Sequence, residues 1–163
     1  MESTIPNAYE TYPFIAPERF TGKLKGKVAI ITGSSVGIGR ETAKAFAAAG
    51  ASVACIARRK ADLDTLVEEI KAAGGHAISI PADVAERGAA KMIVSETEAQ
   101  LGPVDILVNN AAITRISPVA LEDEDMDIWW RVYEVNVKAP VTLTRAVLPS
   151  MLCLLYTSPS PRD

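Results

Sequence analysis

The stretch TGSSVGIG at Thr32–Gly39 decides the fold of this chain. It follows the apolar run Val28–Ile31 and precedes the alanine-rich segment Arg40–Ala49. Glycines let the backbone turn tightly and approach an anion, and the unpaired N–H groups at the start of the following helix attract it. The stretch therefore predicts a short buried strand, a phosphate-binding loop and a helix. An ordinary strand-to-helix turn is the alternative that the glycine pattern alone leaves open.

Composition limits the classes of protein to which the chain can belong. With 163 residues, 48% of them hydrophobic, and a net charge of -3, it fits one soluble globular domain. The absence of a basic block argues against nucleic acid or an anionic membrane as a partner. No run approaches the roughly 20 apolar residues of a membrane span, and the first residues carry acids where a signal peptide is basic and then apolar. We therefore expect a cytoplasmic protein.

The two cysteines have no metal-ligand spacing and form no disulfide framework. We therefore expect no metal site. Cys55 lies in an apolar run, where a thiol behaves as a small core side chain.

Four apolar runs alternate with helical segments along the chain: Val28–Ile31, Ser52–Ile56, Ala77–Ile80 and Val104–Val108. Runs that are apolar on both faces, alternating with helices, predict a parallel sheet covered by helices on either side. The helix after the second run shows the clearest apolar stripe, at spacings i, i+3, i+4 and i+7: Leu63, Leu66, Val67 and Ile70. The fold class is therefore α/β.

Residues 1–22 precede this alternation and have no periodic pattern. Prolines alternate with aromatic residues there, which predicts an irregular, extended arm that packs on the domain or on a second subunit. A disordered leader is the alternative.

Further motifs follow the glycine loop in a fixed order. Asp83 comes after the third apolar run, Asn109-Asn110-Ala111-Ala112 closes the fourth, and Asn136 lies in the next helical segment. With Thr32, Gly33, Gly37 and Gly39 as T-G-x-x-x-G-x-G, the chain closely resembles the classical short-chain dehydrogenase/reductase family from about Lys25 to Met151. One departure is Ala112, where the family has glycine.

The resemblance implies a Rossmann-type doubly wound parallel sheet and an oxidoreductase that moves hydride between a nicotinamide cofactor and a small carbonyl or alcohol. It also implies a homo-oligomeric parent protein, with Asn136 as a member of the catalytic set. The cofactor-binding residues that it implies, together with the basic run after the second strand, are Gly33, Ser35, Val36, Gly37, Ile38, Gly39, Arg58, Arg59, Asp83, Val84, Asn110, Ala111 and Ala112.

Two of these motifs also have a purely structural interpretation. Asp83 followed by Glu86 has the spacing of a capping box and could cap the third helix, in addition to or instead of meeting the adenine. Asn109 and Asn110 could satisfy the backbone of a turn.

The residues after the second strand favour one cofactor over the other. An acid about 20 residues past the loop bonds the ribose 2′-hydroxyl of NAD, whereas an arginine accommodates the 2′-phosphate of NADP. Here the strand ends in Arg58-Arg59-Lys60 and offers no acid. We therefore expect NADP(H) to be favoured over NAD(H), with Arg58 as the primary contact. A solvated charge run is the alternative.

The segment Asp127–Met151 is predicted to be helical, with Pro140 four residues after Asn136. Proline has no N–H, so the carbonyl of Asn136 loses its i+4 donor and the helix bends there. In the family the backbone of this asparagine is thought to hold a water in a proton relay. Of the tandem residues Trp129 and Trp130, we expect one in the core and the other under the arm or a partner subunit.

The resemblance stops before the family's remaining catalytic residues, which are a serine, a tyrosine and a lysine four residues after the tyrosine. Tyr156 is followed at that spacing by Ser160, and Tyr133 by Val137. We therefore expect the chain as given to be inactive. The alternative function is a non-catalytic dinucleotide-binding or interaction fragment.

The last residues, Cys153–Asp163, match the translation of a transposase-type sequencing adapter codon for codon. We therefore expect a partial Rossmann domain over residues 23–152, incomplete in its C-terminal half, followed by a non-native tail. The strand at Val104–Val108 would then be an apolar sheet edge, which favours association and aggregation.

Overall fold

The computed structural model describes residues 17–114 and 126–157. The first described element is a 3₁₀ turn, η2 (Pro17–Phe20), and the rest of the predicted arm lies outside the described residues. The strands and helices that follow are β1 (Val28–Thr32), α1 (Gly37–Ala48), β2 (Ser52–Ala57), α2 (Lys60–Ala72), β3 (His76–Pro81), α3 (Ala89–Leu101), β4 (Ile106–Val108), α4 (Met126–Tyr133), the π-helix η3 (Glu134–Lys138) and α5 (Ala139–Thr157).

The strands form one four-stranded sheet in the order β3-β2-β1-β4. All three pairings are parallel, and β1 lies at the centre, with Ile31 opposite Cys55 of β2 on one side and Val108 of β4 on the other. The predicted doubly wound α/β sheet is confirmed, in the partial form expected. Within the described residues β4 is an edge strand and its three residues are only half-buried.

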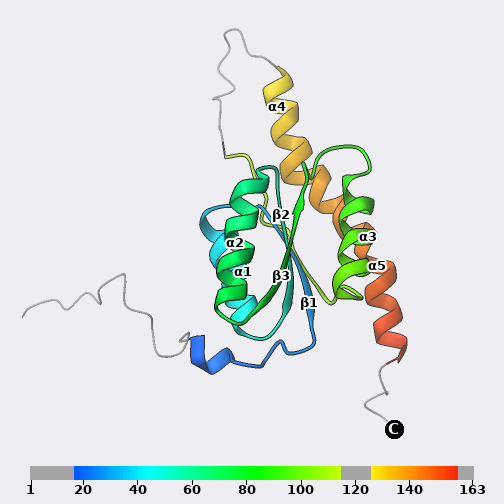
Figure 1. Cartoon of the computed structure of the whole chain (residues 1–163). Coiled ribbons are helices and arrows are strands. Elements are labelled where there is room, and N and C mark those ends of the chain that lie inside the picture. The colour runs from blue at the N-terminus through cyan, green and yellow to red at the C-terminus, as the bar shows by residue number, and fades with distance from the viewer. Residues whose placement is uncertain (1–16, 115–125, 158–163) are drawn as a thin grey trace, which may run out of the picture.

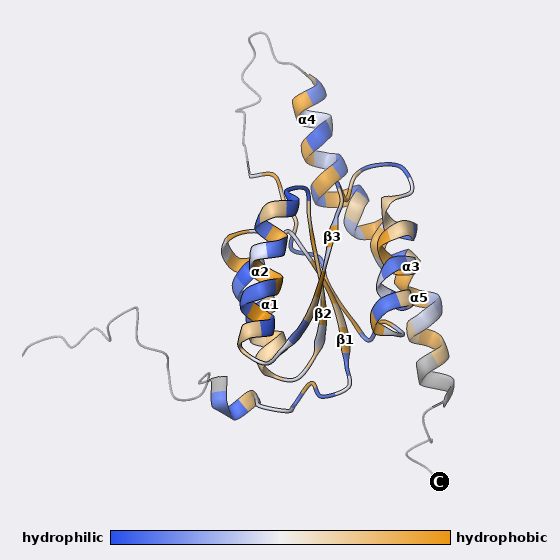
Figure 2. Ribbon diagram, viewed as in Figure 1, coloured by the Kyte–Doolittle hydropathy of each residue, from blue (hydrophilic) through white to orange (hydrophobic). Residues whose placement is uncertain are grey.

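Helices cover both faces of the sheet (Figure 1). On one face α1 and α2 pack against side chains that include Ile31, Val53 and Cys55. On the other face α3 and α5 pack against side chains that include Ile30 and Ile56. Successive residues of β1 serve opposite faces, because side chains alternate along a strand, so both faces need apolar residues. The strands accordingly form the hydrophobic centre of the domain (Figure 2).

The apolar stripe predicted for α2 is confirmed, since all four of its side chains are buried: Leu63, Leu66, Val67 and Ile70. Cys55 is also fully buried in β2, as expected. Burial raises the pKa of the Cys55 thiol to about 12, because the thiolate would have to form inside an apolar core.

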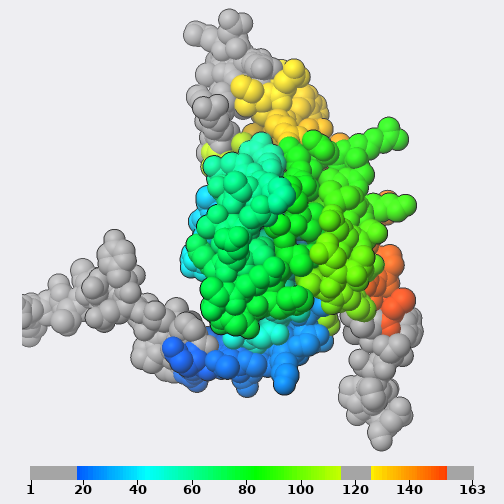
Figure 3. Space-filling view, in the orientation of Figure 1, coloured from blue at the N-terminus to red at the C-terminus, as the bar shows by residue number. Residues whose placement is uncertain are grey.

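The expectation that one of the two tryptophans lies in the core is wrong. Trp129 is 44% exposed and Trp130 is 53% exposed, and no residue of α4 is buried. The helix projects beyond the body of the domain (Figure 3), so it has no apolar surface to pack on among the described residues. Instead the rings pack on each other and on Tyr133, with the Trp129 and Tyr133 rings stacked 6.3 Å apart.

The predicted interruption of the long helix near Pro140 takes the form of a π-helical segment. The N–H of Ala139 bonds the carbonyl of Glu134, five residues back, instead of the carbonyl four residues back. Because Pro140 has no N–H, the carbonyl of Asn136 has no donor at the α-helical spacing. Short π-helical segments of this kind are frequent at functional sites.

Helix α5 runs on to Thr157, into the segment predicted to be a non-native tail, whose remainder lies outside the described residues. The origin of that segment stays a prediction. Among the described residues, no helix combines the length and the apolar character that a membrane crossing requires.

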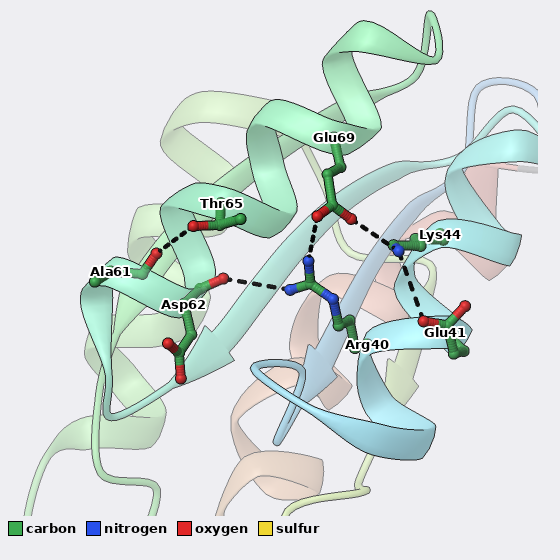
Figure 4. Close-up of polar contacts among 7 residues, drawn as sticks. All are labelled: Arg40, Glu41, Lys44, Ala61, Asp62, Thr65 and Glu69. Atoms are coloured by element: carbon green, nitrogen blue, oxygen red, sulfur yellow. Dashed lines mark hydrogen bonds and ion pairs between the residues drawn. The ribbon is translucent and has the colours of Figure 1, made fainter.

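A charged network joins α1 to α2 on the surface (Figure 4). Arg40 of α1 contacts the Glu69 carboxylate at 2.6 Å and the backbone carbonyl of Asp62 at 3.5 Å. Lys44, one turn further along α1, reaches the other oxygen of Glu69 at 2.8 Å and Glu41 at 3.6 Å. The network therefore holds one carboxylate between two cations.

This network predicts an acid-dependent stability. The hydrogen bond from Lys44, with Coulombic attraction by Arg40, lowers the pKa of Glu69 below its ordinary value of 4.5. A carboxyl whose pKa is lowered on folding stabilises the native state above its unfolded pKa and loses that contribution as the pH falls. We expect wild type to lose more stability between about pH 6 and about pH 3 than Glu69→Gln, measured by urea unfolding. Glu68→Gln is the control, because Glu68 is exposed and shows no ion pair within the described residues; an equal response of both variants would contradict the assignment.

Candidate functional site

The sheet topology creates a crevice at the carboxyl ends of β1 and β4. The chain leaves β1 toward β2 on one side and returns to pair β4 on the other side. Loops that leave neighbouring strands in opposite directions open a crevice between them, which is where ligands bind in such sheets. A cleft of about 490 Å³ lies there. Its lining includes residues that follow all of the strands, among them Gly33, Arg58, Asp83 and Asn110.

The cleft brings together every predicted cofactor-binding residue except Gly37. Gly37 is the first residue of α1, has a positive φ of 60° and faces open space. The lining also contains residues that the sequence did not single out: Ile56, Ala57, Ala82, Ile113, Thr114, Arg131 and Val135.

The start of α1 is left open toward a ligand. Its N-cap residue, Val36, supplies no side-chain hydrogen bond, and no acid lies in the first turn. Ser34 anchors the loop beneath it, because its N–H and its hydroxyl both donate to the carbonyl of Ile56, at 3.2 Å and 3.3 Å. Ile38 is 80% exposed at the cleft and offers an apolar surface. The loop thus presents helix N–H groups beside an apolar side chain.

Gly33 and Gly39 are required by close packing against Asn110. A Cβ at Gly39 would lie 2.4 Å from both Asn110 Nδ2 and the Gly33 carbonyl oxygen. Asn110 Nδ2 donates to the carbonyls of Thr32 and Gly33, at 2.9 Å and 3.2 Å. Asn110 therefore has the turn-satisfying role considered above, and it also lines the cleft. These contacts join the loop after β1 to the loop after β4.

Thr32, the first residue of the glycine motif, lies at the centre of this junction. Its buried hydroxyl donates to the carbonyl of Val108 at 3.3 Å. The same oxygen accepts the backbone N–H groups of Asn110 and Ala111, each at 3.0 Å. The motif spacing identified Thr32, but only the structure shows that its side chain organises the cleft.

Asp83 does not cap α3, because that helix begins six positions later, at Ala89. Its Oδ1 accepts the N–H of Ala85 at 3.0 Å, and its carbonyl accepts the N–H of Glu86 at 3.1 Å, so the residue organises a turn after β3. The capping-box interpretation is therefore wrong. The other oxygen of the carboxylate pairs with Arg131 of α4.

Asn136 reaches the cleft only through a neighbour. Its side chain accepts the N–H of Ile113 at 2.9 Å and donates to the Ile113 carbonyl at 3.0 Å. Ile113 lines the cleft, whereas Asn136 does not. The amide group thus holds the strand-end loop in place, and its side chain is committed to that contact. Its assignment to a catalytic set remains a prediction.

The three basic residues after β2 differ in their partners. Arg59 Nε lies 2.7 Å from Asp62 Oδ2, in an ion pair that lacks hydrogen-bond alignment, and Lys60 lies 2.5 Å from Asp64. Arg58 lines the cleft and makes no ion pair or hydrogen bond within the described residues. Arg58 is therefore the member of the run whose guanidinium is available.

The Thr32 junction makes a testable prediction about stability. Thr32→Val keeps the shape of the side chain but leaves the N–H of Ala111 without its acceptor, at about 1–3 kcal/mol, and leaves the N–H of Asn110 with the carbonyl of Val108 alone. We expect a loss of about 2–3 kcal/mol in the free energy of unfolding, measured by urea denaturation. Thr32→Ser keeps the hydroxyl and is expected to lose only about 1 kcal/mol, for the missing methyl. Equal losses would show that the hydroxyl bonds contribute little.

Comparison with known proteins assigns the chain to a family. The family model for short chain dehydrogenases matches residues 27–157. A short chain dehydrogenase of Pseudocercospora fijiensis (strain CIRAD86) is 64% identical over 152 residues, which cover 93% of this chain and 49% of that protein. An uncharacterized oxidoreductase of Methylorubrum extorquens is 42% identical over 125 residues, 76% of this chain and 50% of that protein. The chain thus spans about half the length of these curated relatives.

A solved structure agrees with this result. A metagenomic short-chain oxidoreductase in complex with NADP has a TM-score of 0.75 and 35% identity, over 80% of this chain and 59% of that one. Both the sequence match and the parallel sheet with its glycine loop therefore lead to one conclusion: the chain belongs to the short-chain dehydrogenase/reductase family.

Proposed function

We propose that this chain binds a nicotinamide dinucleotide in the cleft, NADP(H) in preference to NAD(H). We further propose that the protein it represents interconverts a carbonyl compound and a secondary alcohol. The observation that carries the cofactor assignment is Arg58, a cleft-lining guanidinium with no partner in the described part of the chain. The related metagenomic oxidoreductase was solved in complex with NADP, which supports the same choice.

The cleft fits a dinucleotide in its donors and in its shape. The open start of α1 offers N–H groups to a pyrophosphate, while Gly33 and Gly39 keep side chains out of the space between the loops. Val84 and Ala111 add apolar or backbone surface to the same lining, and Asp83, which also lines the cleft, would meet the adenine. Ser35, Val36, Ile38 and Ala112 complete the proposed binding set.

Arg58 and Arg59 would divide the recognition of a 2′-phosphate unequally. A planar guanidinium can donate two parallel hydrogen bonds to a phosphate. A guanidinium that is already paired with a carboxylate cannot donate both of them. Arg59 is paired with Asp62, so it would contribute mainly its charge, while Arg58 would supply the direct contact. Neither residue would favour NAD, whose ribose hydroxyl prefers an acidic partner.

When bound, the nicotinamide supplies the hydride chemistry. The chain's own contribution is to hold the loop geometry: Thr32 and Asn110 fix the two strand ends, and Asn136 fixes Ile113 at the cleft wall. The carbonyl of Asn136, freed by Pro140, would accept a hydrogen bond from water beside the site. These are orienting roles, which suit a small-molecule substrate in a parent protein that we propose to be a homo-oligomer.

A second candidate function is binding without catalysis. The sequence contains no tyrosine followed four residues later by lysine: Tyr9, Tyr12, Tyr133 and Tyr156 are followed by Pro13, Ala16, Val137 and Ser160. We therefore propose that this chain, expressed alone, binds the cofactor without turning over a carbonyl substrate. Oxidation of NADPH by the chain in the presence of such substrates, followed at its absorbance band, would contradict this part of the proposal.

The cofactor assignment is tested by reversing one charge. Arg58→Asp replaces the proposed phosphate donor with a carboxylate that repels a 2′-phosphate and can bond a 2′-hydroxyl. We expect the Kd for NADPH to rise by about 10- to 100-fold, while the Kd for NADH stays level or falls. Titration of the cofactor fluorescence measures both constants.

The control for this test is Arg87→Asp. It makes the same change of charge at an exposed residue that does not line the cleft. If Arg58→Asp and Arg87→Asp prefer NADPH over NADH to the same extent, the assignment of Arg58 is wrong. A wild-type protein that binds neither cofactor would reject the proposed binding function as a whole.

A further inference from the structure

The ion pair between Asp83 and Arg131 joins two parts of the chain that lie 48 residues apart. Asp83 follows β3, Arg131 belongs to α4, and both line the cleft. The carboxylate is engaged at both oxygens, since Oδ1 accepts the Ala85 N–H and Oδ2 accepts from the guanidinium. Its side chain is only 17% exposed. These two contacts fix the orientation of the carboxylate.

Arg131 is itself oriented by its own helix. Its Nη1 lies 3.5 Å from Oε2 of Glu134, one turn along the chain, while Nη2 reaches Asp83. Its side chain is 34% exposed. No residue of α4 is buried, and the helix continues directly into η3, whose Val135 is in the core. The ion pair with Asp83 ties α4 to the turn after β3 as well.

The pair also sets the charge of the cleft. Among the described lining residues the charged side chains are Arg58, Arg59, Asp83 and Arg131, so Asp83 is the one acid. A dinucleotide brings negative phosphates into this space. An unpaired carboxylate would repel them in a cleft where water screens charges less than it does on an open surface. Arg131 neutralises that carboxylate without removing it.

We propose that Arg131 is a cofactor-positioning residue, which holds the Asp83 carboxylate in place for the adenosine end of the dinucleotide and cancels its charge. This inference rests on the proposed function, because it assumes that the cleft takes a dinucleotide. Arg131 acts on the adenosine end, which NADP(H) and NAD(H) share, whereas Arg58 acts on the 2′-phosphate, which only NADP(H) carries. Loss of Arg131 should therefore weaken the binding of both cofactors, whereas loss of Arg58 should weaken the binding of NADP(H) alone.

Replacement of Arg131 by methionine tests the proposal. Arg131→Met keeps the length and apolar stem of the side chain and removes its charge. We expect the Kd values for NADPH, NADH and ADP-ribose to rise together, by about tenfold each. ADP-ribose lacks the nicotinamide, so an equal loss for this ligand shows that the nicotinamide is not involved in the effect. Arg131→Lys keeps the charge and is expected to bind within about threefold of wild type.

A double-mutant cycle with Asp83→Asn separates positioning through Asp83 from general disruption. If Arg131 acts through the carboxylate, Asp83→Asn alone weakens binding, and adding Arg131→Met to it changes the Kd by less than about twofold. Additive losses in the cycle would show that the two residues act independently, which would overturn the proposal. Thermal melts of each variant accompany the titrations, and Arg131→Gln replaces the methionine variant if the latter does not fold.

Arg145→Met is the matched control, since Arg145 is an exposed arginine of α5 that does not line the cleft. We expect its affinities to equal those of wild type. If wild type binds all three ligands and Arg131→Met binds them within about twofold of wild type, the inference fails and the proposed function stands. If wild type binds none of them, the proposed function itself fails.

Discussion

The buried hydroxyl of Thr32 is the contact on which the candidate site depends. It lies where β1 and β4 end side by side. It donates to the carbonyl of Val108, the last residue of β4, and accepts the N–H groups of Asn110 and Ala111 in the loop that follows. In the opposite direction, the side chain of Asn110 donates hydrogen bonds to the carbonyls of Thr32 and Gly33, at the end of β1. A parallel sheet alone would align the two strands, but it would leave their outgoing loops free to diverge. This pair of side chains keeps the loops at the separation that the cleft requires.

The fold was predictable because its signals are local and repeated. Apolar runs at the positions of β1, β2 and β3 and the stripe of α2 follow from residue spacing, and burial on both faces of the sheet explains why those runs lack polar alternation. The glycines of the loop were predictable for the same reason. A Cβ at Gly33 or Gly39 would clash with neighbouring atoms, so the motif needs glycine at both positions. Most of the cleft therefore followed from motifs that each lie at a strand end.

What the sequence could not supply are contacts between distant segments. Nothing near Arg131 marks it as the partner of Asp83, because the ion pair depends on how α4 leaves the domain. The spacing of Asp83 and Glu86 suggested a cap for a helix that in fact begins later. One of the two tryptophans was expected in the core because large apolar residues usually lie there, yet α4 has no buried residue. The basic run predicted Arg58 as the primary contact, but it could not show that Asp62 and Asp64 pair with the neighbouring cations Arg59 and Lys60.

The fully buried thiol of Cys55 has a consequence for the dynamics of the sheet. It lies on β2 opposite Ile31 and Ser79, in the interior of the sheet, and its raised pKa keeps it protonated at neutral pH. Thiol reagents react with a thiol that is both accessible to solvent and ionised. Cys55 becomes accessible and able to ionise only while the strands are apart. Cys153 is exposed near the end of α5 and does not need such an opening. The rate at which a reagent modifies Cys55 therefore reports how often the centre of the sheet opens, and the rate for Cys153 serves as the reference for a thiol that is already exposed.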